Sequence, residues 1–128
     1  MADAWEIEIE PEVRHWLDTL SDRGYLHAEH IAERLLASPT TLGEPYSRHL
    51  GKGLRELRFH LGHDGDAVRM TYWLAPGRRI VFLTVFRKTR MREDAEVKRA
   101  QQARERCAAE GHTAHDEFTR EMSRGEGR

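Results

Sequence analysis

The residues best suited to chemistry are cations in and beside apolar segments in the middle of the chain. Arg69 lies inside the apolar run 67–74, where a charge without a purpose or a partner is costly. Lys52 lies between two glycines just before another such run, so its backbone and ammonium group can approach a bound anion. Arg87 and Lys88 end a third run. Because the planar fork of arginine suits phosphate oxygens, this pattern favours phosphate chemistry.

The net charge of −1 conceals a strong segregation of charge along the chain. Residues 1–45 carry three basic and ten acidic residues, whereas residues 46–106 carry fifteen basic and seven acidic ones. Residues 107–128 carry three basic and five acidic residues. A basic middle segment in a nearly neutral protein is typical of a phosphate-binding surface. The alternative is a solvated face whose charges are balanced in space by the acidic N-terminal third.

An N-terminal strand and a helical hairpin are expected to support these basic segments. Alternating apolar and acidic residues over 5–10 predict a half-buried strand. A proline then suits the first turn of a helix over 11–20. Ser21 can cap a second helix, which ends before Pro39. Residues 38–53 are rich in glycine and proline, which indicates a loop.

The basic middle segment is predicted to form an antiparallel meander of three strands. These strands cover residues 54–61, 67–74 and 79–87. A last helix follows over about 94–110. The order β-α-α-β-β-β-α predicts an α+β fold, in which a helical hairpin packs on one face of the sheet and a C-terminal helix ends the domain. We expect one domain over 1–111, and an extension over 112–128 that is partly helical and then flexible.

Alternation along the predicted strands assigns the charged residues to faces of the sheet. Glu56 and Arg58 share one face of the first strand, whereas Arg55 lies on the other. The apolar residues of the second strand should face the helical hairpin, which places Arg69 on the open face. An alternative to a functional role is that Arg69 pairs with Glu56 across the sheet as a structural ion pair.

Three short stretches resemble those of a known family. Residues 51–58, Gly-Lys-Gly-Leu-Arg-Glu-Leu-Arg, look like a loop-to-strand segment that ends in Glu-Leu-Arg. Residues 68–72, Val-Arg-Met-Thr-Tyr, look like the strand that bears the family's arginine. Residues 86–89, Phe-Arg-Lys-Thr, look like the strand end Phe-x-Lys-Lys-Thr. With the order of elements, they make residues 5–106 resemble the RelE superfamily and, within it, the HigB-like toxins of phage-derived genes.

This resemblance implies the toxin of a type II toxin–antitoxin system, a metal-independent endoribonuclease that cleaves mRNA in the ribosomal A site and so inhibits translation. It also implies a cognate helix-turn-helix antitoxin, which masks the toxin and represses the operon. Operator DNA would then be contacted only through the antitoxin. The alternatives are a non-catalytic nucleic-acid-binding module and a co-repressor subunit that acts with the antitoxin.

RNA cleavage of this kind sets the roles that the site must fill. The neighbouring 2′-hydroxyl is the nucleophile, so the site must take its proton, stabilise the phosphorane and protonate the departing 5′ oxygen. The catalytic candidates are Arg69, Lys88, Arg58, Glu56 and His60. Arginine is a poor proton acceptor, so a lysine, a histidine or a glutamate must be the base. The chain lacks the tyrosine after the last strand, and the histidine pattern, that some relatives use.

Further residues are candidates for contact with RNA. These candidates are Lys52, Arg55, Arg87 and Trp73. Arg87 and Lys88 point to opposite faces where the last strand ends, and alternation leaves open which of them joins Arg69. Trp73 could stack on a base or be covered by the last helix.

The sequence argues against a metal, a cofactor, a disulfide framework or a membrane segment. Eight histidines are scattered along the chain and there is one cysteine, Cys107, whereas a zinc site needs three or four converging ligands. A lone cysteine suits a reducing cytoplasm. The N-terminus has no apolar signal-peptide region, and no apolar run approaches the roughly 20 residues of a membrane span. We therefore expect a cytoplasmic protein.

Overall fold

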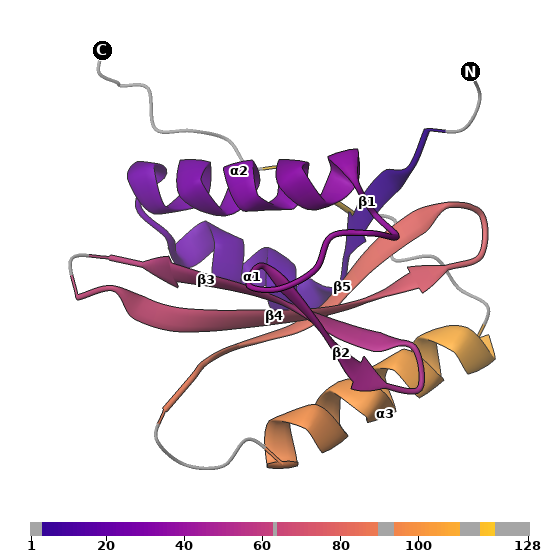
Figure 1. The fold of residues 1–128 in the computed structure, drawn as a ribbon. Helices are drawn as coiled ribbons and strands as arrows, with labels where there is room; N and C mark the ends of the chain where they lie inside the picture. Colours follow the sequence, from indigo (N-terminus) through magenta and orange to yellow (C-terminus); the bar gives the residue numbers. More distant parts are fainter. Residues whose placement is uncertain (1–3, 63, 90–93, 111–115, 120–128) are drawn as a thin grey trace.

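A twisted sheet carries two helices on one face and a third helix on the other (Figure 1). The computed structural model describes residues 4–62, 64–89, 94–110 and 116–119. The strands of this part are β1 (Glu6–Ile9), β2 (Ser47–Gly51), β3 (Leu54–Leu61), β4 (Asp66–Ala75), β5 (Arg79–Arg87) and β6 (Asp116–Glu117). The helices are α1 (Pro11–Thr19), α2 (Asp22–Ala37) and α3 (Asp94–Glu110).

The strands lie in the order β2-β3-β4-β5-β1-β6. Strands β3 to β5 form the expected antiparallel meander of three strands, and β2 adds a fourth antiparallel strand to it. Strand β1 pairs in parallel with β5, so the chain must cross over the sheet before it returns as β2. Helices α1 and α2 make that crossing, and this places them together on one face. The α+β class predicted from the sequence is confirmed, and the seven predicted elements occur in the predicted order, with β2 and β6 in addition.

The main core fills the space between the helical hairpin and the sheet. Helix α2 begins at a Ser21 cap, whose hydroxyl accepts a hydrogen bond of 3.0 Å from the Gly24 N–H. Its apolar residues recur at helical spacing and face the sheet. The largest fully buried side chains of this core are Ile9, Val13, Leu17, Leu35, Leu57, Met70, Tyr72, Ile80 and Phe82. Burial of this apolar surface is the main force that holds the hairpin on the sheet.

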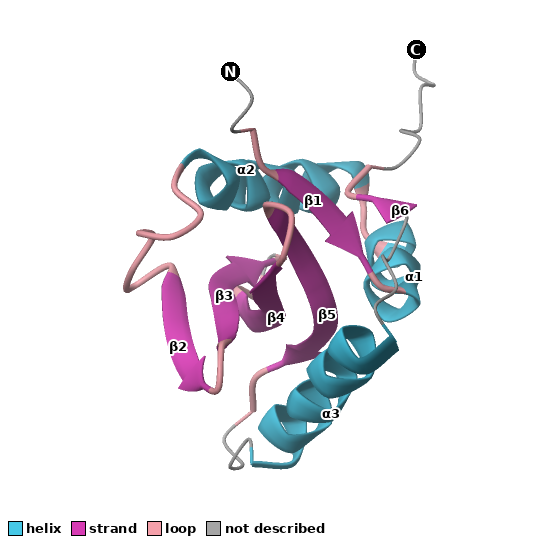
Figure 2. Ribbon diagram, turned by 90° about the vertical axis from the view of Figure 1, so that its right-hand side faces the viewer, coloured by secondary structure: helices cyan, strands magenta, loops and turns pink. Residues whose placement is uncertain are grey.

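A second, smaller core lies under α3 on the opposite face (Figure 2). Leu54, Val81 and Leu83 of the sheet pack there against Ala100 and Cys107 of the helix. Small residues on α3 allow the helix to approach the strands closely. Helix α3 therefore occupies one part of the face on which the sequence placed Arg69. None of the helices in the described ranges is both long and apolar enough to cross a bilayer.

Two strands lie where the sequence did not indicate them. Residues 47–51, inside the segment predicted to be a loop, form β2 at the edge of the sheet. This strand is held by backbone pairing with β3, and its side chains are mostly exposed, so they carry no alternating apolar pattern. Residues 116–117 form β6 against β1. The segment 111–115, which includes the start of the helix predicted there, lies outside the described residues.

Candidate functional site

Arg58 and Arg69 form the centre of a charged cluster on the α3 side of the sheet. They are direct partners across β3 and β4. The Oε2 atom of Glu56 lies 3.9 Å from the Nε of Arg58 and 3.8 Å from the Nε of Arg69. The exposed fractions of the three side chains are 2% for Glu56, 6% for Arg69 and 27% for Arg58. One buried carboxylate thus serves two guanidinium groups.

The charges of this cluster leave an excess of one positive charge. A buried carboxylate is tolerated when cations surround it, and Arg69 is further held by a hydrogen bond of 3.2 Å from its Nη1 to the carbonyl of Val68. The ion pair with Glu56 that the sequence offered as an alternative is therefore present. Arg58 exposes much more of its side chain than Arg69 does, so it is the arginine that an anion reaches first.

The next row of the sheet adds two exposed side chains to the same face. His60 lies opposite Ala67 on β4, and the backbone N–H of Lys88 donates to the Ala67 carbonyl at 2.8 Å. Alternation along each strand puts His60 and Lys88 on the face of the two arginines. Both side chains are exposed. We call the five residues Glu56, Arg58, His60, Arg69 and Lys88 the arginine face.

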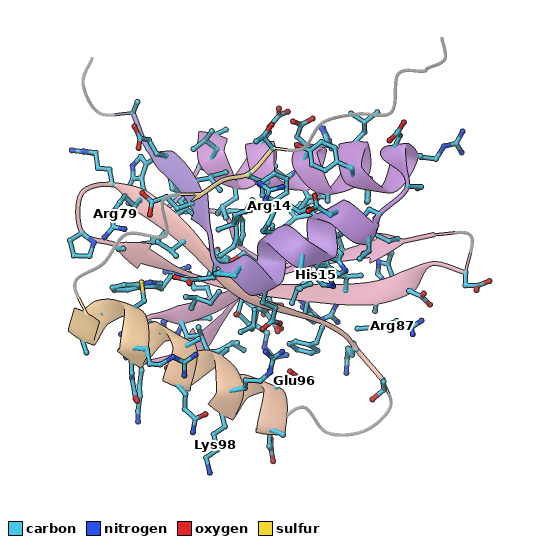
Figure 3. All side chains as sticks on the ribbon, turned by 180° about the vertical axis from the view of Figure 1, so that it is seen from behind. Arg14, His15, Arg79, Arg87, Glu96 and Lys98 are labelled. Atoms are coloured by element: carbon cyan, nitrogen blue, oxygen red, sulfur yellow. The ribbon has the colours of Figure 1, made fainter. Side chains whose placement is uncertain are left out.

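The arginine face contains all five residues that the sequence indicated for catalysis, and they come from β3, from β4 and from the residue that follows β5. The β4–β5 register also shows which of Arg87 and Lys88 lies on the same face of the sheet as Arg69. Arg87 is the partner of Val68, which lies in the core under the helical hairpin, so Lys88 is the residue that joins the cluster. Arg87 instead pairs with Asp66 at 3.0 Å and projects outward at the end of the sheet (Figure 3).

The three other candidates for RNA contact lie elsewhere in the fold. Lys52 is exposed at the tip of the β2–β3 turn, with a left-handed backbone of φ 55°, at the opposite end of β3 from His60. Arg55 lies on the hairpin side of the sheet beside the buried Tyr72. Trp73 shares the face of Arg69, but Arg104 of α3 lies over its ring, 5.7 Å from the ring centroid. Of the two possibilities for Trp73, cover by the last helix is the one observed.

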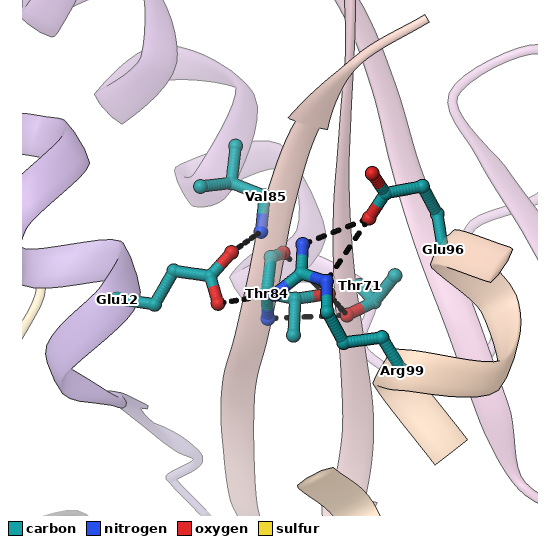
Figure 4. Close-up of polar contacts among 6 residues, drawn as sticks. All are labelled: Glu12, Thr71, Thr84, Val85, Glu96 and Arg99. Carbon is teal, nitrogen blue, oxygen red and sulfur yellow. Dashed lines mark hydrogen bonds and ion pairs between the residues drawn. The ribbon is translucent and has the colours of Figure 1, made fainter. Parts of the chain in front are cut away.

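Two buried threonines follow Arg69 on the same face of the sheet, and Figure 4 draws this polar pair. Thr71 and Thr84 are partners on β4 and β5, and their hydroxyl oxygens lie 2.6 Å apart. The N–H of Thr84 also donates to the Thr71 hydroxyl at 3.2 Å. The register shifts immediately after this pair, so β5 has one extra residue, which is a β-bulge. Both threonines are buried and satisfied, and they support the site without offering a reactive group.

Helix α3 is tied to the other side of the sheet through Glu12 of α1 (Figure 4). One oxygen of Glu12 accepts a hydrogen bond from the Val85 N–H at 3.0 Å, and the other accepts one from Arg99. Arg99 also donates to Glu96 within its own helix. These carboxylates, with the hydrogen bond to Glu12 first, raise the pKa of Arg99 above its ordinary value. No local pattern in the sequence predicts the contact between Glu12 and Arg99, because these residues are 87 positions apart.

Tyr72 and Cys107 are buried and have perturbed pKa values, and both lie away from the arginine face. Burial raises the pKa of Tyr72, whose hydroxyl lies 2.6 Å from that of Ser47. Burial also raises the pKa of the Cys107 thiol under α3. A raised pKa keeps a thiol protonated and unreactive. Both residues are therefore structural parts of the two cores.

Residues from the unforeseen strand β2 and its preceding loop also border the site. Arg48 lies opposite Glu56 in the β2–β3 register, so its exposed side chain extends the basic face by one strand. A pocket of about 500 Å³ opens at the same edge and includes Arg58 and Arg69 in its lining. In the sequence, Arg48 was visible only as a basic residue in a segment predicted to be a loop, and no pattern there indicated a strand beside Glu56. In the described part of the chain, no three His, Cys, Asp or Glu side chains gather as a metal site would require.

The family of the chain follows from a match over most of its length. Residues 15–108 match the family described as "Phage derived protein Gp49-like (DUF891)". The chain belongs to the Gp49-like family. The matched region runs from α1 through α3, so it includes every residue of the arginine face. No curated protein matches the chain.

A solved structure of the E. coli toxin RelE shows the same fold. That structure is an arginine-to-alanine double mutant of RelE in the free state. It superposes with a TM-score of 0.52 at 14% sequence identity, over 80% of this chain and 97% of that chain. At such low identity the likeness concerns the fold alone. The RelE-like fold expected from the sequence is confirmed, and the Gp49-like family agrees with the phage-derived branch that the motifs indicated.

Proposed function

We propose that this Gp49-like protein is the toxin of a type II toxin–antitoxin pair and acts as an endoribonuclease without a metal ion. The observation that carries the proposal is the pair of opposed arginines, Arg58 and Arg69, around the buried Glu56. Such a pair offers two planar donors to one phosphate group. The fold shared with the toxin RelE and the phage-derived family support the same assignment.

Each side chain of the arginine face then has a role in cleavage. The 2′ oxygen of the RNA forms a bond to phosphorus and the bond from phosphorus to the 5′ oxygen breaks, which yields a 2′,3′-cyclic phosphate and a 5′-hydroxyl. Arg58 and Arg69 bind the phosphate and stabilise the added charge of the phosphorane. His60 and Lys88, both exposed beside them, take the 2′ proton and supply the 5′ proton.

Glu56 has a different role in this proposal from that of a base. Its carboxylate is almost fully buried and contacts both arginines, so it is placed to orient them. Since only 2% of its side chain is exposed, Glu56 is also poorly accessible to the substrate. We therefore assign Glu56 as a positioning residue.

The proposed substrate is mRNA on the ribosome, and the proposed partner is a helix-turn-helix antitoxin that masks the toxin and brings it to operator DNA. These assignments rest on the resemblance in the three motifs and on the shared fold. A ribosome-bound substrate is consistent with a site that is an open basic face, since Arg48 and Lys88 are exposed at two of its edges.

A second candidate function is non-catalytic binding of nucleic acid, including co-repression together with the antitoxin. The observation in its favour is that Arg69 and Glu56 form a nearly buried ion pair, as a purely structural pair would. On this hypothesis the exposed cations bind phosphates and no bond breaks.

Mapping of cleavage sites on a translated message by primer extension distinguishes the two functions. The wild-type protein should produce cuts that require ribosomes, and Arg58→Ala should reduce them at least 100-fold. Arg78→Ala is the matched control, because it removes the same charge from an exposed position in the turn between β4 and β5, away from the arginine face. If cuts also occur without ribosomes, the protein is a nuclease whose substrate is free RNA. Folded wild-type protein that makes no cuts would overturn the nuclease in favour of the binding function.

A further inference from the structure

A pocket beside the arginine face lies next to the part of β3 that extends beyond its pairing with β2. The β2–β3 register starts at Ser47 opposite Leu57, and one more hydrogen bond of 2.8 Å joins the Arg58 N–H to the Tyr46 carbonyl. Pro45, which comes before Tyr46, has no N–H with which to extend the pairing. We call the space beyond this point the β3-edge pocket. Its lining consists of His27, Ile31, Pro45, Tyr46, Arg58, Phe59, His60 and Arg69.

The walls of the β3-edge pocket are flat and largely apolar. Ile31 and Phe59 belong to the buried core and form its inner side. The His27 ring meets the Phe59 ring edge-on, with centroids 6.1 Å apart. Tyr46 is fixed by Arg34, whose guanidinium carbon lies 4.4 Å from its ring centroid. Aromatic and imidazole rings of this kind are what a planar heterocycle stacks on.

The open edge of β3 adds directional hydrogen-bonding groups to the pocket. Backbone groups of alternate residues in a strand point to the same side. Because the Arg58 N–H points toward Tyr46, the N–H and the carbonyl of His60 point to that side too, beyond Ser47, the first residue of β2. They present one donor and one acceptor next to each other, as the edge of a nucleobase requires.

The pocket is continuous with the phosphate-binding cations, because Arg58 and Arg69 are part of its lining. Its volume of about 500 Å³ lies within the range of roughly 300–1,000 Å³ of small-molecule sites. A ligand that spans it has an anionic group at one end and a planar apolar group at the other. We propose that the β3-edge pocket binds the nucleobase of an RNA nucleotide whose phosphate lies against Arg58 and Arg69; this deepens the proposed function and rests on it.

A peptide strand from a partner protein is the competing occupant, because an open strand edge can pair with another chain. The observations favour the nucleobase. The open stretch of β3 that follows Arg58 is short, since β3 ends at Leu61, and a paired strand gains little affinity over so few residues. The two arginines at the end of the pocket also match a phosphate.

The test measures binding of three ligands to the full-length protein by calorimetry: a nucleoside 3′-monophosphate, ribose 3-phosphate and inorganic phosphate. The nucleotide should bind roughly tenfold more tightly than ribose phosphate, which is the contribution expected from one stacked base. His27→Ala should remove most of this difference and leave the affinity for ribose phosphate unchanged. His30→Ala is the matched control, since His30 is another exposed histidine of α2 that does not line the pocket.

Tyr46→Ala should also remove most of the difference in affinity between the nucleotide and ribose phosphate. If Tyr46→Ala does not fold, the result for His27→Ala alone tests the proposal. Equal affinities for the nucleotide and ribose phosphate would overturn the proposal. So would a variant that binds nucleotide normally but loses the antitoxin, because the pocket would then be a protein-docking site. The assay involves no cleavage. A wild-type protein that discriminates the base but never cleaves RNA would overturn the nuclease alone, whereas cleavage without discrimination would overturn the pocket alone.

Discussion

Arg58 and Arg69 lie directly opposite one another on β3 and β4, with each Nε less than 4 Å from the same oxygen of Glu56. Two like charges at facing positions of a sheet repel each other. The shared carboxylate offsets this repulsion, so the sheet can hold two guanidinium groups side by side and still keep one net positive charge. Glu56 is therefore the residue on which the geometry of the arginine face depends.

Glu56→Gln should destabilise the protein by about 2–4 kcal/mol, because it leaves two guanidinium groups without their counter-ion while one of them is buried. The measurement is the free energy of unfolding from urea denaturation at neutral pH. Glu33→Gln, which makes the same change on an exposed position of α2, should shift it by less than about 0.5 kcal/mol. A Glu56→Gln variant as stable as this control would mean that the ion pairs contribute nothing to the fold.

Arg58→Lys should lower the rate of RNA cleavage about tenfold although it keeps the charge. Lysine carries a point charge and cannot make the two parallel hydrogen bonds of a guanidinium group. Single-turnover cleavage rates of the two proteins provide the measurement. Since 27% of the Arg58 side chain is exposed, the substitution should leave the unfolding midpoint nearly unchanged. Equal rates would show that Arg58 acts only through its charge.

Glu12→Ala should cost more stability than Arg99→Ala, even though the two residues form one ion pair. Loss of Glu12 leaves the Val85 N–H without its acceptor, at a cost of about 1–2 kcal/mol. Loss of Arg99 removes a partly exposed ion pair that contributes less than about 1 kcal/mol. Urea denaturation of both variants tests the order. The reverse order would show that the attachment of α3, and not the hydrogen bond to β5, is the main contribution.

The free energy of unfolding should fall at alkaline pH because of Tyr72. Burial raises the pKa of Tyr72 in the folded protein above its ordinary value of 10.0, so the folded state holds the phenol proton more tightly than the unfolded state. This stabilisation is complete below pH 10 and is lost as the pH rises toward the folded-state pKa.

Urea denaturation at several pH values between 8 and 11 measures how steeply the free energy of unfolding falls with pH. Tyr72→Phe should flatten this slope, although the variant also loses the contact with Ser47 and starts from a lower stability. Cys107 contributes to the decline from its ordinary value of 9.0 upward, so both proteins are best compared with Cys107→Ala in the background. Identical slopes with Tyr72 and Phe at this position would contradict the prediction.

The sequence predicted correctly the helices and strands that bury one face. The helices and the three meander strands carry apolar residues at their own periods, since burial selects those residues position by position. Alternation also placed Glu56, Arg58 and Arg69 on one face, as the structure confirms. Strand β2 has no such pattern, because backbone pairing with β3 holds it and most of its side chains face solvent.

By itself, then, the sequence determined the α+β class, the helical hairpin and the strands that carry the arginines, because these depend on local periodicity. Only the tertiary structure decided that Lys88 joins Arg69, that α3 covers Trp73, and that His27 and Tyr46 meet the two arginines in one pocket. Each of these depends on strand register or on contacts between segments far apart in the chain. Strand register is fixed by turn geometry together with the face that each strand buries, so it becomes definite only when the strands are packed into the sheet.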